Sequence, residues 1–331
     1  MPPLRIGVLG AAKIAPPAIV RPARAVDDAE VVAIAARDPS RAQAFATKHR
    51  IPHVHKSYSS LVEDPDVDAI YNPLPNGLHG RWTIAALEAG KHVLCEKPFT
   101  ANAAEAEEVA AVARRSGLVV MEAFHYRYHP LAIRLVELVR SGELGSIEHI
   151  ETWMCTPLLP QGDIRWQRDL AGGSTMDVGC YTIHLMRSLA GTEPEVVSAD
   201  ARERSAGVDR WMRADMRLPD DATGRITAAM LSARILALGA RVRGSLGEIR
   251  VLNPYAPHYF HWMVVRGPNG RRRERFSRTP TYEYQLRAFV GAVLRDEPIL
   301  TGPDDSIATM RVIDDCYRAA GMEVRQPARG T

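Results

Sequence analysis

The chain has 331 residues and 46% of them are apolar, which is enough for two domains with a sizeable core each. With 42 Lys and Arg against 39 Asp and Glu, its formal net charge of +3 argues against a nucleic-acid or anionic-membrane partner and favours a small-molecule ligand. Its four cysteines form no CxxC or Cys/His cluster, so we expect no disulfide framework, no metal site and a reducing, cytoplasmic location. A signal-like start and an apolar run of about 18 residues are also missing, which argues against a membrane partner.

The first part of the chain alternates short apolar runs with segments of helical period. Such a pattern is typical of parallel strands joined by crossover helices. The expected strands are residues 5–10, 30–36, 69–72, 92–95 and 118–122, and helices are expected over 81–89 and 102–116. Asn102 followed by Glu105 is typical of a capping box at the start of the second helix.

Beyond residue 124 the pattern changes. A helix over 130–140, a strand over 147–155 and a helix from 175 to 189 precede a series of strands with short turns, and two helices over 282–295 and 306–321 end the chain. We therefore predict an α/β protein with an N-terminal Rossmann domain, residues 1–124, and a C-terminal α+β domain, residues 125–331. The second domain is expected to contain a large, mostly antiparallel open sheet, with the last helix packed back on the Rossmann domain.

A degenerate dinucleotide fingerprint follows the first strand. Gly10, Ala12 and Ala15 give a G-x-A-x-x-A pattern around Lys13 and Ile14, in which Gly10 permits the tight turn and the small residues let a pyrophosphate approach the helix. An ordinary tight turn is the alternative. Its place in the first strand–helix unit favours nucleotide binding.

The residues after the second strand bear on the choice of dinucleotide. NAD binding favours an acidic residue there, but Asp38 precedes Pro39 and is expected to cap the next helix instead. Arg37 and Arg41 would then face a 2′-phosphate, which favours NADP, with NAD as the alternative.

Two segments carry residues suited to hydride transfer. Lys97, in Glu96-Lys97-Pro98, follows a parallel strand at the end where such sheets bind ligands, and its ammonium would stabilise a reacting oxygen. Glu96 would hold this lysine, and Pro98 is a candidate for a cis peptide bond. In the second segment, a helix would bring Asp177, Tyr181 and His184 onto one face.

These motifs resemble the glucose-fructose oxidoreductase, inositol dehydrogenase and rhizopine catabolism (Gfo/Idh/MocA) family over nearly the whole chain. The resemblance rests on the Gly10 turn, Pro75-Asn76 with His79, the Glu96-Lys97-Pro98 motif, and Gly172-Gly173 with Asp177 and Tyr181. Many polyol dehydrogenases of the family have histidine at the position of Tyr181. The tyrosine is similar to the branch that contains dimeric dihydrodiol dehydrogenase and NADP-dependent xylose dehydrogenase.

The resemblance implies catalytic roles for Lys97 and Tyr181, with Asp177 beside them. It also implies cofactor contacts by Pro75, Asn76, His79 and Glu96. Tyr181 fits a general acid/base because a nearby cation lowers the pKa of a phenol, and Lys97 would be that cation. Arg127, Arg165, Trp166 and His184 are expected to line the substrate site, where domain packing is the alternative for each.

The sequence therefore predicts an NADP-dependent oxidoreductase acting on a hydroxyl of a cyclic sugar, glycoside or trans-dihydrodiol. Two alternatives stay open: an NAD-dependent glycoside hydrolase that retains its cofactor, and a non-catalytic NAD(P) sensor. A homodimer through the C-terminal sheet is expected, because an open sheet face needs covering.

Overall fold

We describe a computed structural model that places residues 2–159 and 162–329. Its contacts divide the chain into two units, and the first combines Met1–His125 with Pro280–Ile307. The second unit combines Tyr126–Thr279 with Ala308–Thr331. The first break in the chain thus falls one residue beyond the predicted boundary at 124, whereas the return of Pro280–Ile307 to the first unit was not predicted.

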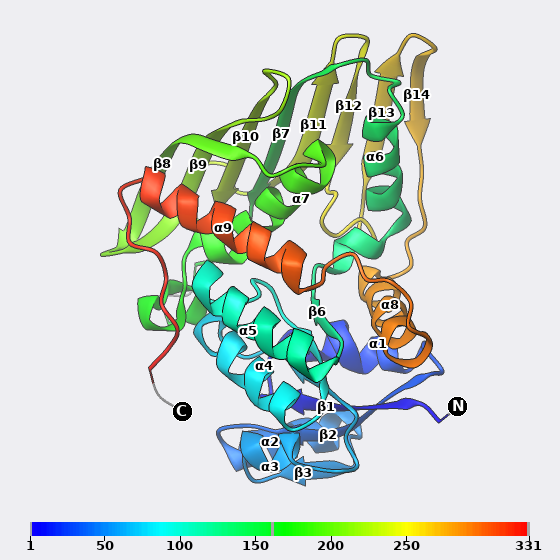
Figure 1. The fold of residues 1–331 in the computed structure, drawn as a ribbon, viewed down its shortest axis with the longest axis vertical. Helices are drawn as coiled ribbons and strands as arrows, with labels where there is room; N and C mark the ends of the chain where they lie inside the picture. Colours follow the sequence, from blue (N-terminus) through cyan, green and yellow to red (C-terminus); the bar gives the residue numbers. More distant parts are fainter. Residues whose placement is uncertain (1, 160–161, 330–331) are drawn as a thin grey trace. The chain divides into compact units, whose positions relative to one another are not determined.

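The first unit contains a six-stranded parallel sheet in the order β3-β2-β1-β4-β5-β6 (Figure 1). Its strands are β1 (Leu4–Leu9), β2 (Ala29–Ala35), β3 (His53–His55), β4 (Ala69–Asn72), β5 (His92–Cys95) and β6 (Val120–Glu122). Five of them match predicted strands. β3 was missed because His53-Val54-His55 has a single apolar residue.

Helices connect these strands. They are η1 (Pro16–Val20), α1 (Arg21–Ala23), α2 (Pro39–His49), α3 (Tyr58–Val62), η2 (Asn76–Leu78), α4 (His79–Glu88) and α5 (Ala103–Ser116). At the start of α5, Asn102 Oδ1 accepts from the Glu105 amide at 2.9 Å, as predicted, while the Glu105 carboxylate accepts from the Ala101 amide at 2.8 Å.

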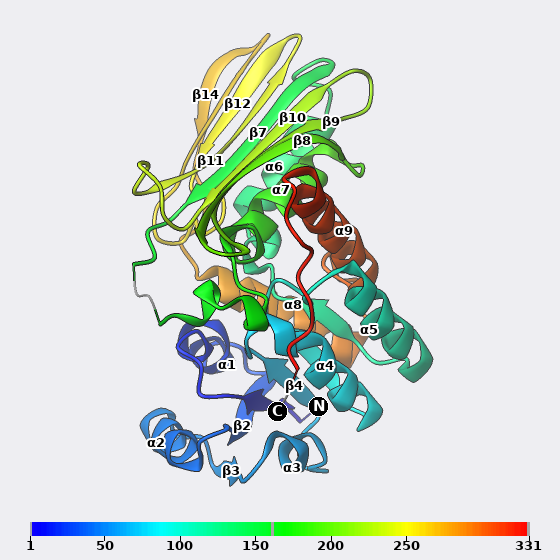
Figure 2. The ribbon, with the colours of Figure 1, turned by 90° about the vertical axis from the view of Figure 1, so that its left-hand side faces the viewer.

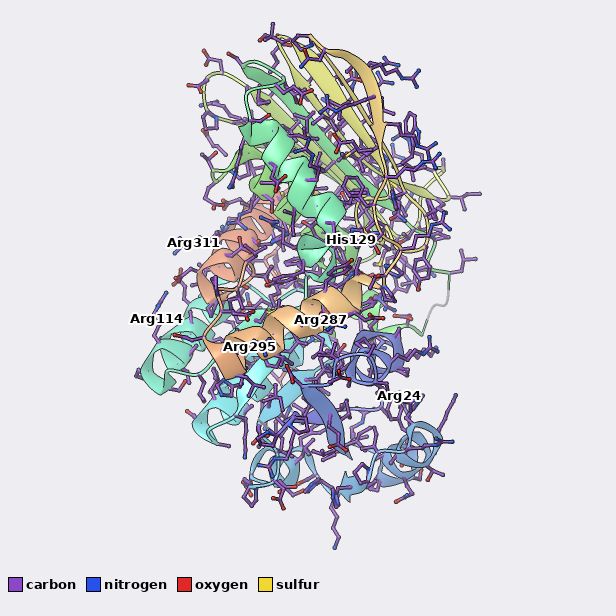
Figure 3. All side chains as sticks on the ribbon, turned by 90° about the vertical axis from the view of Figure 1, so that its right-hand side faces the viewer. Arg24, Arg114, His129, Arg287, Arg295 and Arg311 are labelled. Carbon is purple, nitrogen blue, oxygen red and sulfur yellow. The ribbon has the colours of Figure 1, made fainter. Side chains whose placement is uncertain are left out.

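Helix α8 (Thr281–Arg295) completes the first unit, although it lies far along the chain. Arg287 donates to the carbonyl oxygen of Ala25 at 2.8 Å, and Arg295 pairs with Asp28 at 3.1 Å; both arginines are labelled on α8 in Figure 3. After α8, Thr301 exchanges two hydrogen bonds with Glu122 of β6. The chain therefore returns to the six-stranded parallel sheet of the first unit after it has formed most of the second unit.

The second unit is built on an eight-stranded sheet in the order β14-β13-β12-β11-β7-β10-β9-β8. β7 and β10 are parallel and every other neighbouring pair is antiparallel. The strands are β7 (Ile147–Cys155), β8 (Glu195–Ser205), β9 (Val208–Arg217), β10 (Thr223–Ala229), β11 (Ala237–Gly244), β12 (Gly247–Leu252), β13 (Trp262–Gly267) and β14 (Gly270–Glu274). This mixed sheet is the large, mostly antiparallel sheet that the sequence predicts.

One face of this sheet packs against helices of the same unit, as Figure 2 shows nearly edge-on. The helical elements of the unit are α6 (Pro130–Arg140), η4 (Ile164–Trp166), η5 (Arg168–Leu170), η6 (Thr175–Gly179) and α7 (Cys180–Ala190), together with most of η3 (His125–Tyr128) and of α9 (Pro303–Ala319). Within the placed residues, no helix covers the opposite face (Figure 2). Ion pairs join neighbouring strands of the sheet: Arg213 of β9 pairs with Asp200 of β8, and Arg225 of β10 pairs with Asp215 of β9.

The last helix, α9, is divided between the two units. Only the first residues of α9, to Ile307, belong to the first unit, and Ala308 onward belongs to the second. The helix packed into the first unit is α8, whose arginines meet the loop between α1 and β2. No helix among residues 2–159 and 162–329 has the length and apolar character needed to cross a membrane.

Candidate active site

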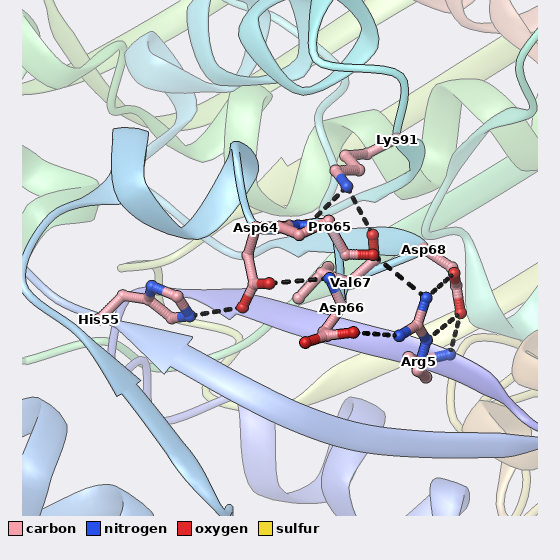
Figure 4. A network of polar contacts seen from close by, with 8 residues as sticks. All are labelled: Arg5, His55, Asp64, Pro65, Asp66, Val67, Asp68 and Lys91. Atoms are coloured by element: carbon pink, nitrogen blue, oxygen red, sulfur yellow. Dashed lines mark hydrogen bonds and ion pairs between the residues drawn. The ribbon is translucent and has the colours of Figure 1, made fainter.

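The two ends of the parallel sheet differ in chemistry, and we call them the amino edge and the carboxyl edge. At the amino edge, Arg5 of β1 bonds Asp66 and Asp68, which precede β4 (Figure 4). Lys91, which precedes β5, donates to the carbonyl oxygens of Asp64 and Val67 at 2.6 and 2.7 Å. These contacts join the beginnings of three strands, so the amino edge is a structural network.

The carboxyl edge holds the predicted nucleotide residues. Gly10 follows β1 with φ +86°, and an added Cβ would lie 3.1 Å from the Leu74 side chain, so a larger residue would be strained and crowded there. Ala12 and Ile14 are half-buried, and Lys13 is exposed. The sheet order reverses between β1 and β4, which places this turn at the switch point where open α/β sheets bind ligands.

Arg37 and Arg41 lie exposed after β2. Asp38 between them caps α2, as predicted: its carboxylate accepts from the Ser40 amide at 2.9 Å and from the Ser40 hydroxyl at 2.7 Å. Hydrogen bonds from Ser40 lower the pKa of Asp38. Because this carboxylate is engaged with α2, the two arginines supply the charge at this corner. Neither guanidinium forms an ion pair with any placed residue.

Sequence analysis missed Tyr58 at this corner. Its hydroxyl accepts from the Arg37 amide at 3.3 Å and lies 3.8 Å from where a Cβ on Gly10 would stand. The ring meets Trp82 edge-on, with centroids 5.0 Å apart, and burial raises the pKa of Tyr58. Tyr58 therefore lies between the turn at Gly10 and the segment that holds Arg37 and Arg41. The only signal for it in the sequence is its place after β3, a strand that was itself missed.

His79 contacts the loops that follow β4 and β5 and so links them. Its ring nitrogens lie 2.6 Å from the Leu74 carbonyl oxygen and 2.7 Å from that of Pro98. Burial lowers the pKa of His79 to about 4, with the two carbonyls opposing and the charge of Lys97 adding to the shift. Pro75 and Asn76, in the same loop, are half-buried. The geometry thus gives His79 a buried, structural set of partners, and its cofactor contact stays a prediction.

The segment after β5 holds Lys97. The Glu96 carboxylate accepts from the Tyr71 hydroxyl at 2.8 Å and from the Lys97 amide at 3.3 Å, so Glu96 fixes the backbone of the lysine. The Lys97–Pro98 peptide bond is cis, which confirms the sequence prediction. Lys97 itself is half-buried, at the same sheet edge as Gly10 and Arg37.

The second group of predicted residues lies in the second unit. Asp177 belongs to the π-helical turn η6, and Tyr181 and His184 belong to α7, which continues it. The sequence predicted this helix but not its π turn. π turns are frequent at functional sites.

Tyr181 belongs to a cluster of aromatic rings. The centroid of its ring lies 5.9 Å from that of Tyr126 and 5.8 Å from that of Tyr255, and 6% of the residue's surface is exposed. His184 is buried and its Nδ1 lies 2.6 Å from the Tyr126 hydroxyl. The packing therefore orients the Tyr181 ring, and it leaves His184 little surface for a substrate.

Arg165 lies between two carboxylates. Its guanidinium bonds Asp163 at 3.2 Å and Asp177 at 3.2 Å, and the charge of Asp177 raises its pKa. Trp166 packs in an apolar cluster with Val178, and the Arg204 guanidinium lies 4.6 Å from its ring centre. Arg127 is half-buried in η3. The structure thus brings Arg165 to Asp177, while the Trp166 ring is mostly covered.

The arrangement defines a nucleotide-binding oxidoreductase built from two units. Comparison with known proteins gives the family: residues 4–124 match the oxidoreductase family with an NAD-binding Rossmann fold, and residues 133–250 match the GFO/IDH/MocA C-terminal domain. The chain therefore belongs to the Gfo/Idh/MocA family, as the sequence motifs indicated.

Three relatives illustrate the range of the family. A D-xylose 1-dehydrogenase (NADP(+)) from Haloferax volcanii is 37% identical over 96% of this chain and 97% of its own. A trans-1,2-dihydrobenzene-1,2-diol dehydrogenase from Macaca fascicularis is 35% identical over 68% of this chain and 67% of its own. The crystal structure of a 3-ketoreductase from Actinomadura kijaniata with NADP and TDP-benzene superposes with a TM-score of 0.88 at 31% identity, covering 96% of this chain and 98% of that one.

Proposed function

We propose that this protein is an NADP-dependent oxidoreductase that interconverts a hydroxyl and a carbonyl group on a cyclic sugar or glycoside, with Lys97 and Tyr181 as its catalytic pair. The observation that carries the proposal is the carboxyl edge of the parallel sheet, where Gly10, two arginines and Lys97 follow three strands of the sheet, β1, β2 and β5. The names of the relatives support the same class of reaction.

The residues present fit NADP. The positive φ of Gly10 leaves room for a pyrophosphate to approach the backbone, and the exposed guanidiniums of Arg37 and Arg41 suit a 2′-phosphate. In an NAD-binding enzyme an acidic residue at this position accepts from the ribose hydroxyls, but the Asp38 carboxylate here caps α2. Bound NADP supplies the hydride acceptor for oxidation, and its reduced form supplies the donor for reduction.

The side chains would perform the proton chemistry. When a hydroxyl is oxidised, the Tyr181 phenolate takes its proton as the carbonyl forms, and in reduction the phenol returns it. The Lys97 ammonium would stabilise the negative charge that develops on the reacting oxygen. Asp177, held by Arg165, would orient substrate hydroxyls.

The charge at Arg165 favours a neutral substrate over a nucleotide sugar. Its guanidinium already has two carboxylate partners, Asp163 and Asp177. Among the substrates of the named relatives, an aldose or glycoside therefore fits better than a diphosphate ester, and a trans-dihydrodiol is the second candidate.

The decisive assay mixes purified protein with NADP or NAD and a panel of aldoses, glycosides, inositols, trans-dihydrodiols and a dTDP-sugar, and follows nicotinamide absorbance. We expect turnover with NADP and a neutral sugar, and Tyr181→Phe should lose about 100-fold or more in kcat while binding NADP normally. Glycoside cleavage with cofactor retained through purification, or cofactor binding without any turnover, would contradict the proposal in favour of a hydrolase or a sensor.

The uncovered sheet face is the candidate surface for a homodimer. Trp211 lies there between the guanidiniums of Arg202 and Arg213, at 5.1 and 6.0 Å, and tryptophan and arginine are enriched in protein interfaces. Cytoplasmic location remains the expectation drawn from cysteine usage.

A further inference from the structure

A buried carboxylate lies at the amino end of the helix that carries Asp177 and Tyr181. Asp209 of β9 has no exposed surface. Its Oδ2 accepts from the Ser174 hydroxyl, the Thr175 amide and the Thr175 hydroxyl, each at 2.7 Å. Its Oδ1 accepts from the hydroxyl of Tyr317 and from Arg325 Nη2, each at 2.9 Å. Five donors saturate the acceptor capacity of this carboxylate.

Arg325 balances the charge from the segment that follows α9. Its side chain is 2% exposed, it donates from Nε to the Gly172 carbonyl oxygen at 2.8 Å, and it stacks 4.2 Å from the Tyr317 ring centre. Arg325 and Asp209 therefore hold both the loop before the helix and its first residues.

The loop is shaped for this contact. Gly173 has φ +132°, and a Cβ on it would lie 2.1 Å from Asp209 Oδ1. A Cβ on Gly172 would lie 2.5 Å from the Arg165 carbonyl oxygen. The pair of glycines lets the chain close around the carboxylate, and no other residue fits at position 173 without moving it.

The first turn of the helix depends on this anchor. Ser174, the residue before η6, provides no side-chain cap of its own for the helix, so an acceptor from β9 takes that role. The Asp177 amide donates to the Gly173 carbonyl oxygen at 3.0 Å, which places Asp177 one turn beyond the anchored residues. A π turn is an uncommon backbone conformation and needs such outside support.

We propose that Asp209 and Arg325 are positioning residues that fix Asp177 and Tyr181 for the reaction, so that the segment after α9 serves catalysis without touching the substrate. This inference rests on the proposed function. Its alternative is a buried ion pair that stabilises the second unit and does nothing more.

The test separates stability from positioning with two variants of the full chain. Arg325→Leu alone leaves the Asp209 charge buried without its guanidinium and is expected to destabilise the fold strongly. Arg325→Leu combined with Asp209→Asn removes both charges, so we expect it to regain most of the melting temperature. In this double variant the side-chain amide oxygen at position 209 still accepts from Thr175, but the Gly172 carbonyl oxygen loses its hydrogen bond from Arg325 Nε.

For the double variant we expect kcat to fall on the order of 10- to 100-fold with KM for NADP unchanged, since the cofactor residues lie in the first unit. Arg325→Lys, which keeps the positive charge but replaces the guanidinium by a single ammonium nitrogen, should recover part of kcat. The matched control is Arg272→Leu, which removes the ion pair of β14 with Glu143 elsewhere in the second unit and should leave kcat unaltered. A well-folded double variant with the kcat of the wild type would overturn the inference.

Hydrogen–deuterium exchange gives a readout that needs no turnover. Amides 175–181 should exchange faster in the double variant than in the wild type, while those of β13, β14 and the six-stranded sheet should be unchanged. Unaltered exchange at 175–181 would overturn the positioning role even if no sugar were a substrate. Conversely, an active wild type that needs Tyr181 but tolerates the double variant would refute only this inference and leave the proposed function standing.

Discussion

The amino and carboxyl edges of the parallel sheet each carry a lysine next to β5, but the two lysines have different surroundings. Lys91 and Lys97 each lie next to β5, at its two ends. Lys91 is buried and donates to two carbonyl oxygens of the loop before β4, whereas Lys97 is half-buried and follows the carboxyl end of β5. The comparison teaches that position relative to strand direction, more than residue type, separates a structural lysine from the one that we propose as catalytic.

Removal of each lysine should give the largest contrast. Lys97→Ala is expected to lower kcat by about 100- to 10,000-fold, because it removes the cation that stabilises the reacting oxygen and the phenolate. The melting temperature should stay close to that of the wild type. Steady-state kinetics and thermal unfolding measure both effects.

Lys91→Met is the matched control at the opposite end of β5. It should lower the free energy of unfolding by about 1–3 kcal/mol, since two buried carbonyl oxygens lose a charged donor, and leave kcat of the folded protein unchanged. Loss of catalysis in Lys91→Met, or full activity in Lys97→Ala, would break the comparison between the edges.

The second contrast concerns pH. Burial raises the pKa of Glu105, near the carboxyl edge, to about 7. The unfolded chain loses this proton near pH 4.5 and the folded protein holds it to about pH 7, so the stability that Glu105 contributes is fully present below pH 4.5 and is lost as pH rises to about 7. The expected loss is about 3 kcal/mol, at about 1.4 kcal/mol per pKa unit.

Glu105→Gln should remove this pH dependence. Denaturant unfolding between about pH 5 and 8 would measure it, with Glu88→Gln on the exposed surface of α4 as the control that keeps the wild-type profile. A wild type whose stability is constant over this range would show that Glu105 is ionised throughout.

The third prediction, with the smallest expected effect, compares the binding of NADP with that of NAD. Arg37→Ala combined with Arg41→Ala should weaken NADP binding by about 10- to 100-fold and NAD binding much less, because only NADP carries the 2′-phosphate. Fluorescence titration with NADPH and NADH measures both affinities. Equal losses for the two nucleotides would mean that these arginines do not recognise the phosphate.

Much of the fold could be predicted because its signals are local. Apolar runs gave five of the six parallel strands, and Asp38 before Pro39 gave the cap of α2. The Lys97–Pro98 motif also identified its cis peptide bond. Three-residue β3 has too few apolar side chains for such a signal.

The remaining features depend on residues far apart in the sequence. Asp209 and Arg325 are 116 residues apart, and neither has a neighbour that marks it as a partner. The return of α8 to the first unit depends on Arg287 and Arg295, two of many arginines in the chain. Periodicity likewise cannot distinguish a π turn from an α-helix over five residues, so η6 was predicted only as a helix.

The order of the eight-stranded sheet has a consequence for synthesis on the ribosome. β7 lies at its centre, yet its two neighbours are β10 and β11, which are translated long after it. Both sides of β7 therefore stay unsatisfied in the nascent chain until residues 223–244 emerge, and the first unit waits longer still for 280–307. The growing polypeptide thus exposes an unpaired strand until β10 and β11 have been translated, the condition under which chaperone binding protects against aggregation.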